Sequence, residues 1–239
     1  MIFALLIFLF FLLIPSPAFA WGPLTHIYLG SEIYYLGSLL PVWVFNLIKR
    51  YRGDYLYGNL MADIILAKNL LPPEKNSHSW EVGFGLLESS RKSSEKAFSL
   101  GYISHLAADT VAHGKYTNGK SIVHTFLELR ADSLIDRKYW VKAIGIDRNI
   151  QYRNDKFLED SLERAIFSFK TNKRIFKGVL FLSGLNKEKL GDFIDRNLLT
   201  SVKKEDIKKL QEESLERIID VLCNGDRSAV LKKNPIARR

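Results

Sequence analysis

The chain has 239 residues, of which 47% are apolar and 26% are charged, and its formal net charge at pH 7 is +9. This length is enough to bury one good core. The single cysteine, Cys223, excludes an internal disulfide, so an exported form must rely on its core or on bound metal. The positive charge favours anionic partners, but it does not distinguish phospholipid surfaces, nucleic acid and a merely soluble basic surface.

The first twenty residues are set apart by their composition. Residues 1–13 are almost unbroken Leu, Ile and Phe, and Ala18-Phe19-Ala20 follows them. The apolar run is too short to span a bilayer comfortably, and small residues at this spacing suit a signal peptidase. We therefore predict a signal peptide over 1–20, cleavage after Ala20, and export to the periplasm or the extracellular space. Because no Lys or Arg precedes the apolar run, an uncleaved membrane anchor is the alternative.

After Trp21 nearly every segment has helical periodicity, and no alternating strand pattern occurs. The pattern predicts one all-α domain over 21–239, a multi-helix bundle without Gly-, Pro- or Ser-rich linkers. All five histidines lie between positions 26 and 124, so any metal cluster belongs to the N-terminal half. The predicted helices cover 25–37, 41–52, 54–69, 77–90, 93–115, 119–142, 155–171, 186–197 and 202–223.

The last predicted helix has a clear apolar stripe and a clear stop. Ile207, Leu210, Ile218, Ile219 and Leu222 share one face, and Lys and Glu fill the other. Asn224-Gly225 follows, as expected for a helix end. Leu71-Pro72-Pro73 and Asn118-Gly119 are the clearest loops elsewhere.

The helix over 93–115 carries the densest group of chemically active side chains. His105, Asp109 and His113 are four residues apart, so they rise along one face with a drift of about 40° per step. Two imidazoles and a carboxylate in this register can share divalent metals, whereas a lone histidine is more often a packing or surface residue. Gly101 lies one turn before His105, where the missing side chain lets another backbone approach the site closely.

Other polar residues extend this pattern. His124 and Glu128 again place imidazole and carboxylate one turn apart, although a helix-surface hydrogen bond would explain the pair equally well. Asp63 lies in an apolar stretch, where burying a carboxylate is costly unless a cation or donors satisfy it. His26 and His78 complete the histidines, and each is a weak signal alone.

In this order the residues resemble the zinc-dependent phospholipase C family. Relatives of that family include the N-terminal domain of glycosylphosphatidylinositol-specific phospholipase D and, more distantly, the fungal single-strand-specific nucleases. Trp21-Gly-Pro-Leu-Thr-His26 resembles the family's mature start, in which a Trp ligates zinc through its free amino group and carbonyl oxygen. The positions that match the family's ligands are Trp21, His26, Asp63, His78, His105, Asp109, His113, His124 and Glu128.

The resemblance implies up to three zinc ions. The first would be held by Asp63, His78, His105 and Asp109, the second by Trp21, His26 and the bridging Asp109, and the third by His113, His124 and Glu128. Three residues separate Asp109 from His113, whereas the best-known phospholipases C and the nucleases have five. In this spacing the chain is similar to the glycosylphosphatidylinositol-specific enzyme.

A zinc cluster lowers the pKa of water toward about 7 and neutralises charge on phosphate oxygens. The expected function is therefore that of a secreted phosphodiesterase acting on phospholipid at a membrane surface, with C-type cleavage and with Asp63 orienting the attacking water or taking its proton. The alternatives are a single-strand-specific zinc nuclease, D-type cleavage, or a helical protein that metal merely stabilises. Tyr55, Tyr57 and Trp80 either line a headgroup pocket or belong to the core. No obligate protein partner is inferred.

Overall fold

The computed structural model describes residues 21–64, 76–116, 128–161, 168–184 and 203–235. Within these ranges the chain forms helices and turns and no strand, which confirms the all-α prediction. The signal peptide predicted over 1–20, the helix predicted over 186–197, and the loops at Leu71-Pro72-Pro73 and Asn118-Gly119 lie outside the described residues. None of the described helices is both long enough and apolar enough to cross a bilayer.

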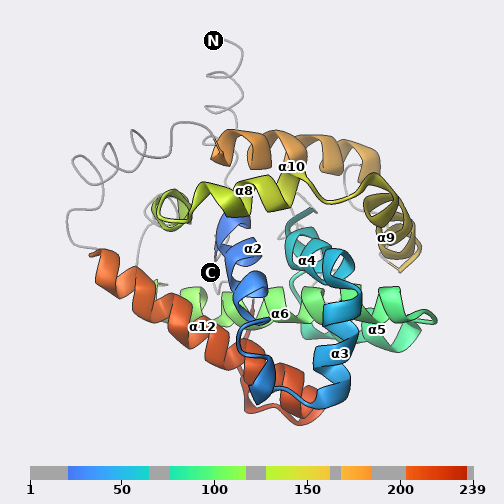
Figure 1. The fold of residues 1–239 in the computed structure, drawn as a ribbon, viewed down its shortest axis with the longest axis horizontal. Coiled ribbons are helices and arrows are strands. Elements are labelled where there is room, and N and C mark those ends of the chain that lie inside the picture. Colours follow the sequence, from blue (N-terminus) through green and yellow to red (C-terminus); the bar gives the residue numbers. More distant parts are fainter. Residues whose placement is uncertain (1–20, 65–75, 117–127, 162–167, 185–202, 236–239) are drawn as a thin grey trace.

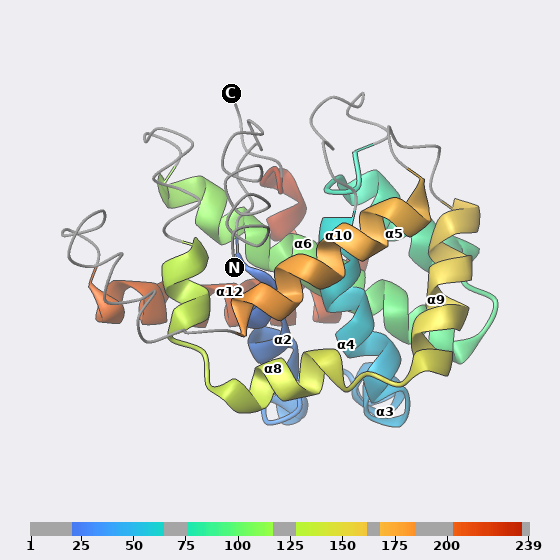
Figure 2. The ribbon, with the colours of Figure 1, turned by 90° about the horizontal axis from the view of Figure 1, so that it is seen from above.

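The longest of the described helices, α6, runs through the centre of the fold (Figure 1). It packs against α4, α12 and α5, while α8 packs on α2 and α9 on α4. Seen from above, α10 lies across the bundle, where it contacts α2, α8 and the turn after α4 (Figure 2). Within the described residues the main α-helices are α2 (Pro23–Glu32), α3 (Val42–Arg50), α4 (Arg52–Met61), α5 (Trp80–Ser89), α6 (Ser93–Tyr116), α8 (Arg137–Ile144), α9 (Arg148–Ser161), α10 (Phe169–Ser183) and α12 (Lys204–Asn224).

Two glycines allow α4 and α6 to cross at very short range. A Cβ added to Gly58 would lie 2.0 Å from the carbonyl oxygen of Phe98, and one added to Gly101 would lie 2.0 Å from that of Tyr55. Neither position can accept a side chain without separating the two backbones. The prediction that Gly101 admits another backbone is confirmed, and the partner is α4.

Several helix ends follow from the capping side chains near them. The predicted helix over 77–90 begins at Trp80 because the Ser79 hydroxyl accepts a hydrogen bond from the backbone N–H of Val82. Helix α12 ends at Asn224, and Gly225 has a φ of 57°, a conformation that glycine adopts at little cost. The predicted stripe of α12 is confirmed, since Ile207, Leu210, Ile218 and Leu222 are buried and Ile219 packs against the core.

The continuous helix predicted over 119–142 is wrong in its described part. The chain is helical over 128–133, turns, and restarts as α8 at Arg137. The cause is Asp136, whose carboxylate accepts from the backbone N–H of Lys138 at 2.7 Å and caps the new helix. Residues 119–127 lie outside the described part.

The next two helices also differ from the prediction. Helix α9 begins at Arg148 rather than near 155, because the Asp147 carboxylate accepts from the backbone N–H of Asn149 at 2.8 Å. Helix α10, over Phe169–Ser183, overlaps only the end of the predicted segment 155–171. Ser168 accepts from the backbone N–H of Thr171 at its start. In both cases a short polar side chain begins a helix where hydrophobic periodicity alone did not indicate one.

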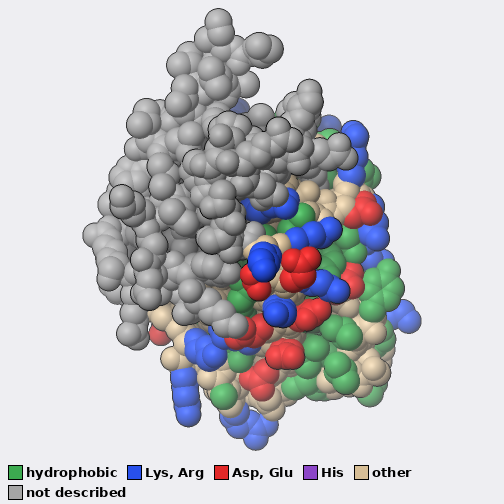
Figure 3. All heavy atoms as spheres, turned by 90° about the vertical axis from the view of Figure 1, so that its left-hand side faces the viewer, with side chains coloured by type: hydrophobic (Ala, Val, Ile, Leu, Met, Phe, Trp, Pro, Cys, Tyr) green, Lys and Arg blue, Asp and Glu red, His purple; other side chains and the backbone are tan. Residues whose placement is uncertain are grey.

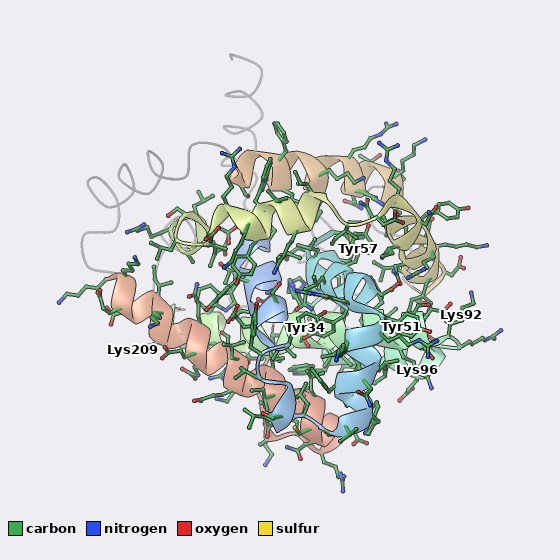
Figure 4. All side chains as sticks on the ribbon, in the orientation of Figure 1. Tyr34, Tyr51, Tyr57, Lys92, Lys96 and Lys209 are labelled. Atoms are coloured by element: carbon green, nitrogen blue, oxygen red, sulfur yellow. The ribbon has the colours of Figure 1, made fainter. Side chains whose placement is uncertain are left out.

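The described surface carries charges of both signs. Figure 3 looks at the side where α12 begins, and there Lys and Arg side chains alternate with Asp and Glu. Lys209 on α12, and Lys92 and Lys96 around the start of α6, are exposed and lie at the periphery (Figure 4). On the described part of this face, the excess positive charge is therefore not gathered into one basic patch.

Candidate metal centre

Four segments meet at one buried cluster of imidazoles and carboxylates. Helix α2 contributes His26, the turn after α4 contributes Asp63, the residues before α5 contribute His78, and α6 contributes His105 and Asp109. Each of these five residues is at most 4% exposed. One ligand atom from each of His26, Asp63 and His105 lies within 4.8 Å of the other two, and the same holds for His78, His105 and Asp109.

The two carboxylate oxygens of Asp109 face different histidines. Its Oδ1 lies 3.2 Å from His26 Nε2, while its Oδ2 lies 3.1 Å from both His78 Nε2 and His105 Nε2. Asp63 Oδ1 completes the second group, at 3.1 Å from His78 Nε2 and 3.8 Å from His105 Nε2. A carboxylate placed in this way can bridge two metal ions.

Residues behind the histidines orient their rings. The Nδ1–H of His105 donates to the carbonyl oxygen of Asn59 at 2.9 Å. Because a carbonyl only accepts, this bond places the proton on Nδ1 and leaves the Nε2 lone pair for a metal. The ring of His26 stacks on that of His105 with centroids 3.6 Å apart. The backbone N–H of His78 donates to Asn76 Oδ1 at 2.9 Å, which holds His78 in place before α5.

The contacts within the cluster leave two of its side chains, His26 and Asp109, without hydrogen bonds among the described residues. Among the described residues, both ring nitrogens of His26 and both carboxylate oxygens of Asp109 are buried without a hydrogen-bond partner. The Nε2 atoms of His78 and His105 face each other at 3.1 Å, although each is needed as a lone-pair donor toward the centre. Leaving the His26 nitrogens and the Asp109 oxygens without partners costs about 1–3 kcal/mol each. Neutral imidazole and carboxylate are ligands that Zn²⁺ prefers, so the residues fit this ion.

Burial and charge act in opposite directions on the pKa values of the cluster. Burial, followed by the charge of His105, lowers the pKa of His26. Burial alone would lower the pKa of His105, but the carboxylates of Asp109 and Asp63 outweigh it and raise that pKa. Burial would also raise the pKa of Asp109, but the imidazoles of His105 and His26 hold it well below its usual range. Asp109 is therefore ionised at neutral pH, as a metal ligand must be.

The remaining candidate ligands are placed only in part. Trp21 is buried, and its indole N–H is shared between the Ala108 carbonyl at 3.2 Å and the Ser214 hydroxyl at 3.1 Å. Ala108 precedes Asp109, so Trp21 is anchored beside the cluster. The backbone of His113 continues α6, and Glu128 is buried at the start of the helical residues 128–133. His124, and with it the third predicted ligand set, lies outside the described residues.

Two residues that surround the metal centre, Asn59 and Asp132, were not indicated by sequence patterns. Asn59 acts through its main chain, which leaves no signal in the residue type. Asp132 is a buried carboxylate that accepts from the first backbone N–H groups of α2. Its position one turn after Glu128 continues the register of His124 and Glu128, and that register is the signal that would have found it.

The aromatic residues that could line a headgroup pocket do not all have the same environment. Tyr55 and Tyr57 are buried core residues, and their hydroxyls bond Ser104 at 3.1 Å and Asp155 at 2.5 Å. Trp80 is partly buried, and its indole N–H donates to the Lys233 carbonyl at 2.9 Å. For the two tyrosines the core interpretation is the correct one.

Comparison with known proteins adds an independent finding. The family model for zinc-dependent phospholipase C matches residues 25–174, which include every candidate ligand except Trp21. Searches of curated proteins and of solved structures returned no significant match. The match covers more than half of the chain, and the buried imidazoles and carboxylates within it suit the metal on which that family depends. The chain thus belongs to the zinc-dependent phospholipase C family and is a zinc-dependent phosphoric diester hydrolase.

Proposed function

We propose that this hydrolase is exported and cleaves phospholipids at a membrane surface, releasing the phosphorylated headgroup. The observation that carries the proposal is the Asp109 carboxylate, whose Oδ1 lies near His26 and whose Oδ2 lies near both His78 and His105. Such an arrangement suits paired zinc ions acting on one phosphate. The net charge of +9 supports attraction to anionic lipid through long-range electrostatics.

In this proposal the chain's own residues position the reaction. When bound, zinc lowers the pKa of water and neutralises charge on phosphate oxygens. Asp109 holds the two halves of the centre together, and Asn59 keeps the His105 Nε2 free to ligate. Asp63 contacts both His78 and His105, so it is placed to orient a water or accept its proton. Water attacks phosphorus in line, the bond to the glycerol oxygen breaks, and that oxygen takes a proton.

Export is the second part of the proposal. Cleavage after Ala20 would give Trp21 a free amino group beside Ala108 and Asp109, where the indole already anchors the residue. The family's mature start supports this interpretation. Mass spectrometry of the protein recovered outside the cytoplasm tests it, and a mass that includes residues 1–20 would contradict it.

The substrate is tested with zinc-loaded protein that begins at Trp21 and mixed phospholipid vesicles. Phosphorus NMR should show phosphorylated headgroups, and Asp109→Asn protein should release none. Phosphatidic acid would instead establish D-type cleavage by the same centre. If all lipids stay intact while single-stranded nucleic acid is hydrolysed, the lipid proposal is wrong and the enzyme is a zinc nuclease.

A further inference from the structure

A buried carboxylate outside the predicted ligand set faces the beginning of α2. Asp132 is 4% exposed and lies in the helical residues 128–133, one turn after Glu128. Its Oδ1 accepts from the backbone N–H and the hydroxyl of Thr25, each at 2.8 Å, and its Oδ2 accepts from the backbone N–H of Leu24 at 3.1 Å. The first N–H groups of a helix have no partner inside it. Gly22, the N-cap residue of α2, has no side chain to supply one.

The carboxylate lies so close to Gly22 that a side chain at position 22 would have to displace it. A Cβ added to Gly22 would lie 2.4 Å from Asp132 Oδ2 and 2.5 Å from its Cγ, with no room for either to remain in place. Asp132 therefore acts as the cap of α2 from a different helix. Hydrogen bonds to an ionised carboxylate are about twice as strong as those between neutral groups.

The contact lies between two candidate zinc ligands. Trp21 directly precedes Gly22, and His26 directly follows Thr25. Trp21 is anchored on its other side by the Ala108 carbonyl and the Ser214 hydroxyl. The helical residues that carry Asp132 also carry Glu128, so one short element links the start of α2 to a candidate ligand of the third zinc.

We propose that Asp132 is a positioning residue that holds Trp21 and His26 at the metal centre, with Gly22 as the partner that makes its approach possible. The proposal rests on the proposed function, in which Trp21 and His26 share one zinc ion with Asp109. Asp132 touches no reacting atom and acts only through the beginning of α2. Residues that orient metal ligands in this way typically contribute 10–100-fold to metal affinity.

Zinc affinity is the direct test, measured by chelator competition on protein that begins at Trp21. We expect Asp132→Asn and Asp132→Ala to weaken one zinc by about 10–100-fold. kcat should fall while KM stays unchanged, since the substrate contacts remain. Asp136→Asn is the matched control, because Asp136 also caps a helix, accepting from Lys138 at 2.7 Å, but caps α8 rather than the ligand-bearing α2. It should leave zinc affinity unchanged.

A double-mutant cycle tests the contact itself. Gly22→Ala should weaken zinc binding in the natural chain, because the new methyl group meets the Asp132 carboxylate. In the Asp132→Ala background the same change should have a much smaller effect, because the obstructing group is gone. Gly85→Ala, where a Cβ meets nothing within 4 Å, should have no effect in either background.

The outcomes separate this inference from the proposed function. If the natural chain binds no zinc, the proposed function fails. If it binds zinc and a folded Asp132→Asn protein binds it with the same affinity, Asp132 has no positioning role and the proposed function stands. Additive effects of Gly22→Ala and Asp132→Ala on zinc affinity would equally overturn the inference. Far-UV circular dichroism verifies the fold of each variant.

Discussion

At the scale of single residues, the environment of Asp109 explains why this carboxylate is ionised and shared. It is fully buried, yet the imidazoles of His105 and His26 hold its pKa well below the usual range. Its two oxygens lie near different histidines, so one negative charge is shared between His26 and His105. A buried carboxylate with this many nitrogen neighbours and no hydrogen-bond partner among the described residues is best satisfied by cations.

Removing Asp109 should therefore affect more zinc than removing Glu128. We expect Asp109→Ala to lose zinc at both positions that share its carboxylate, whereas Glu128→Ala should lose it at one. Metal analysis of the two purified variants by inductively coupled plasma mass spectrometry measures the difference. Equal losses would contradict a bridging role for Asp109.

The histidines determine the response to acid. A proton on Nε2 occupies the lone pair that zinc needs, so zinc affinity decreases as the pH falls. The carboxylates of Asp109 and Asp63 raise the pKa of His105, whereas burial lowers the pKa of His26, so His105 protonates more readily than His26 when the metal leaves. We expect zinc release and loss of activity as the pH falls below about 6, near the ordinary histidine pKa. Zinc retained after dialysis at stepwise lower pH measures it, and full occupancy at pH 4 would contradict it.

At the scale of elements, the crossing of α4 and α6 positions the centre. Gly58 and Gly101 bring the two backbones into contact, and the same approach places the Asn59 carbonyl at His105. Asp63 follows the end of α4, so its distance from the α6 histidine depends on this crossing too. Gly58 and Gly101 therefore help to position the site, although neither has a side chain that could contact a metal ligand.

Gly101→Ala should damage stability and zinc binding together. The added Cβ would lie 2.0 Å from the Tyr55 carbonyl oxygen, so the helices must separate, at a cost of about 1–3 kcal/mol. Urea unfolding measures the loss, and metal analysis measures the accompanying decrease in zinc. Gly85→Ala, in open space on α5, should change stability by less than about 1 kcal/mol. An unchanged unfolding midpoint for Gly101→Ala would show that the crossing tolerates a side chain.

At the scale of the whole molecule, the proposed centre depends on where the mature chain begins. An amide nitrogen has no lone pair available to zinc at neutral pH, whereas a free amine does. Protein beginning at Phe19 should therefore bind one zinc fewer than protein beginning at Trp21. In both forms the Trp21 indole should still donate to Ala108 and Ser214. Metal analysis of the two forms provides the comparison. Identical zinc content would exclude the Trp21 amine as a ligand.

Helix boundaries show why sequence patterns alone reached only part of the fold. The helix predicted over 93–115 agrees with α6 at its start, Ser93, and along its described length, which reaches Tyr116. The sequence did not predict the break before α8, because Asp136 is equally compatible with the surface of a continuous helix. The structure shows that its carboxylate caps α8 by accepting from the backbone N–H of Lys138. Local patterns of this kind permit two structures, and here the capping contact of Asp136 selects one.

The sequence by itself determined the helical class, the register of His105 and Asp109 on one face, and the family to which the chain belongs. These depend on neighbouring residues and on motif order, which the chain carries without folding. The resemblance already implied that Asp63 and His78 join the ligands on α6. Only the tertiary structure decided which oxygen of Asp109 lies near which histidine, that the Asn59 carbonyl orients His105, and that Asp132 caps α2. Contacts between distant segments depend on the distance between the packed helices. Here Gly58 and Gly101 set that distance, and no local sequence pattern predicts which backbone each of them contacts.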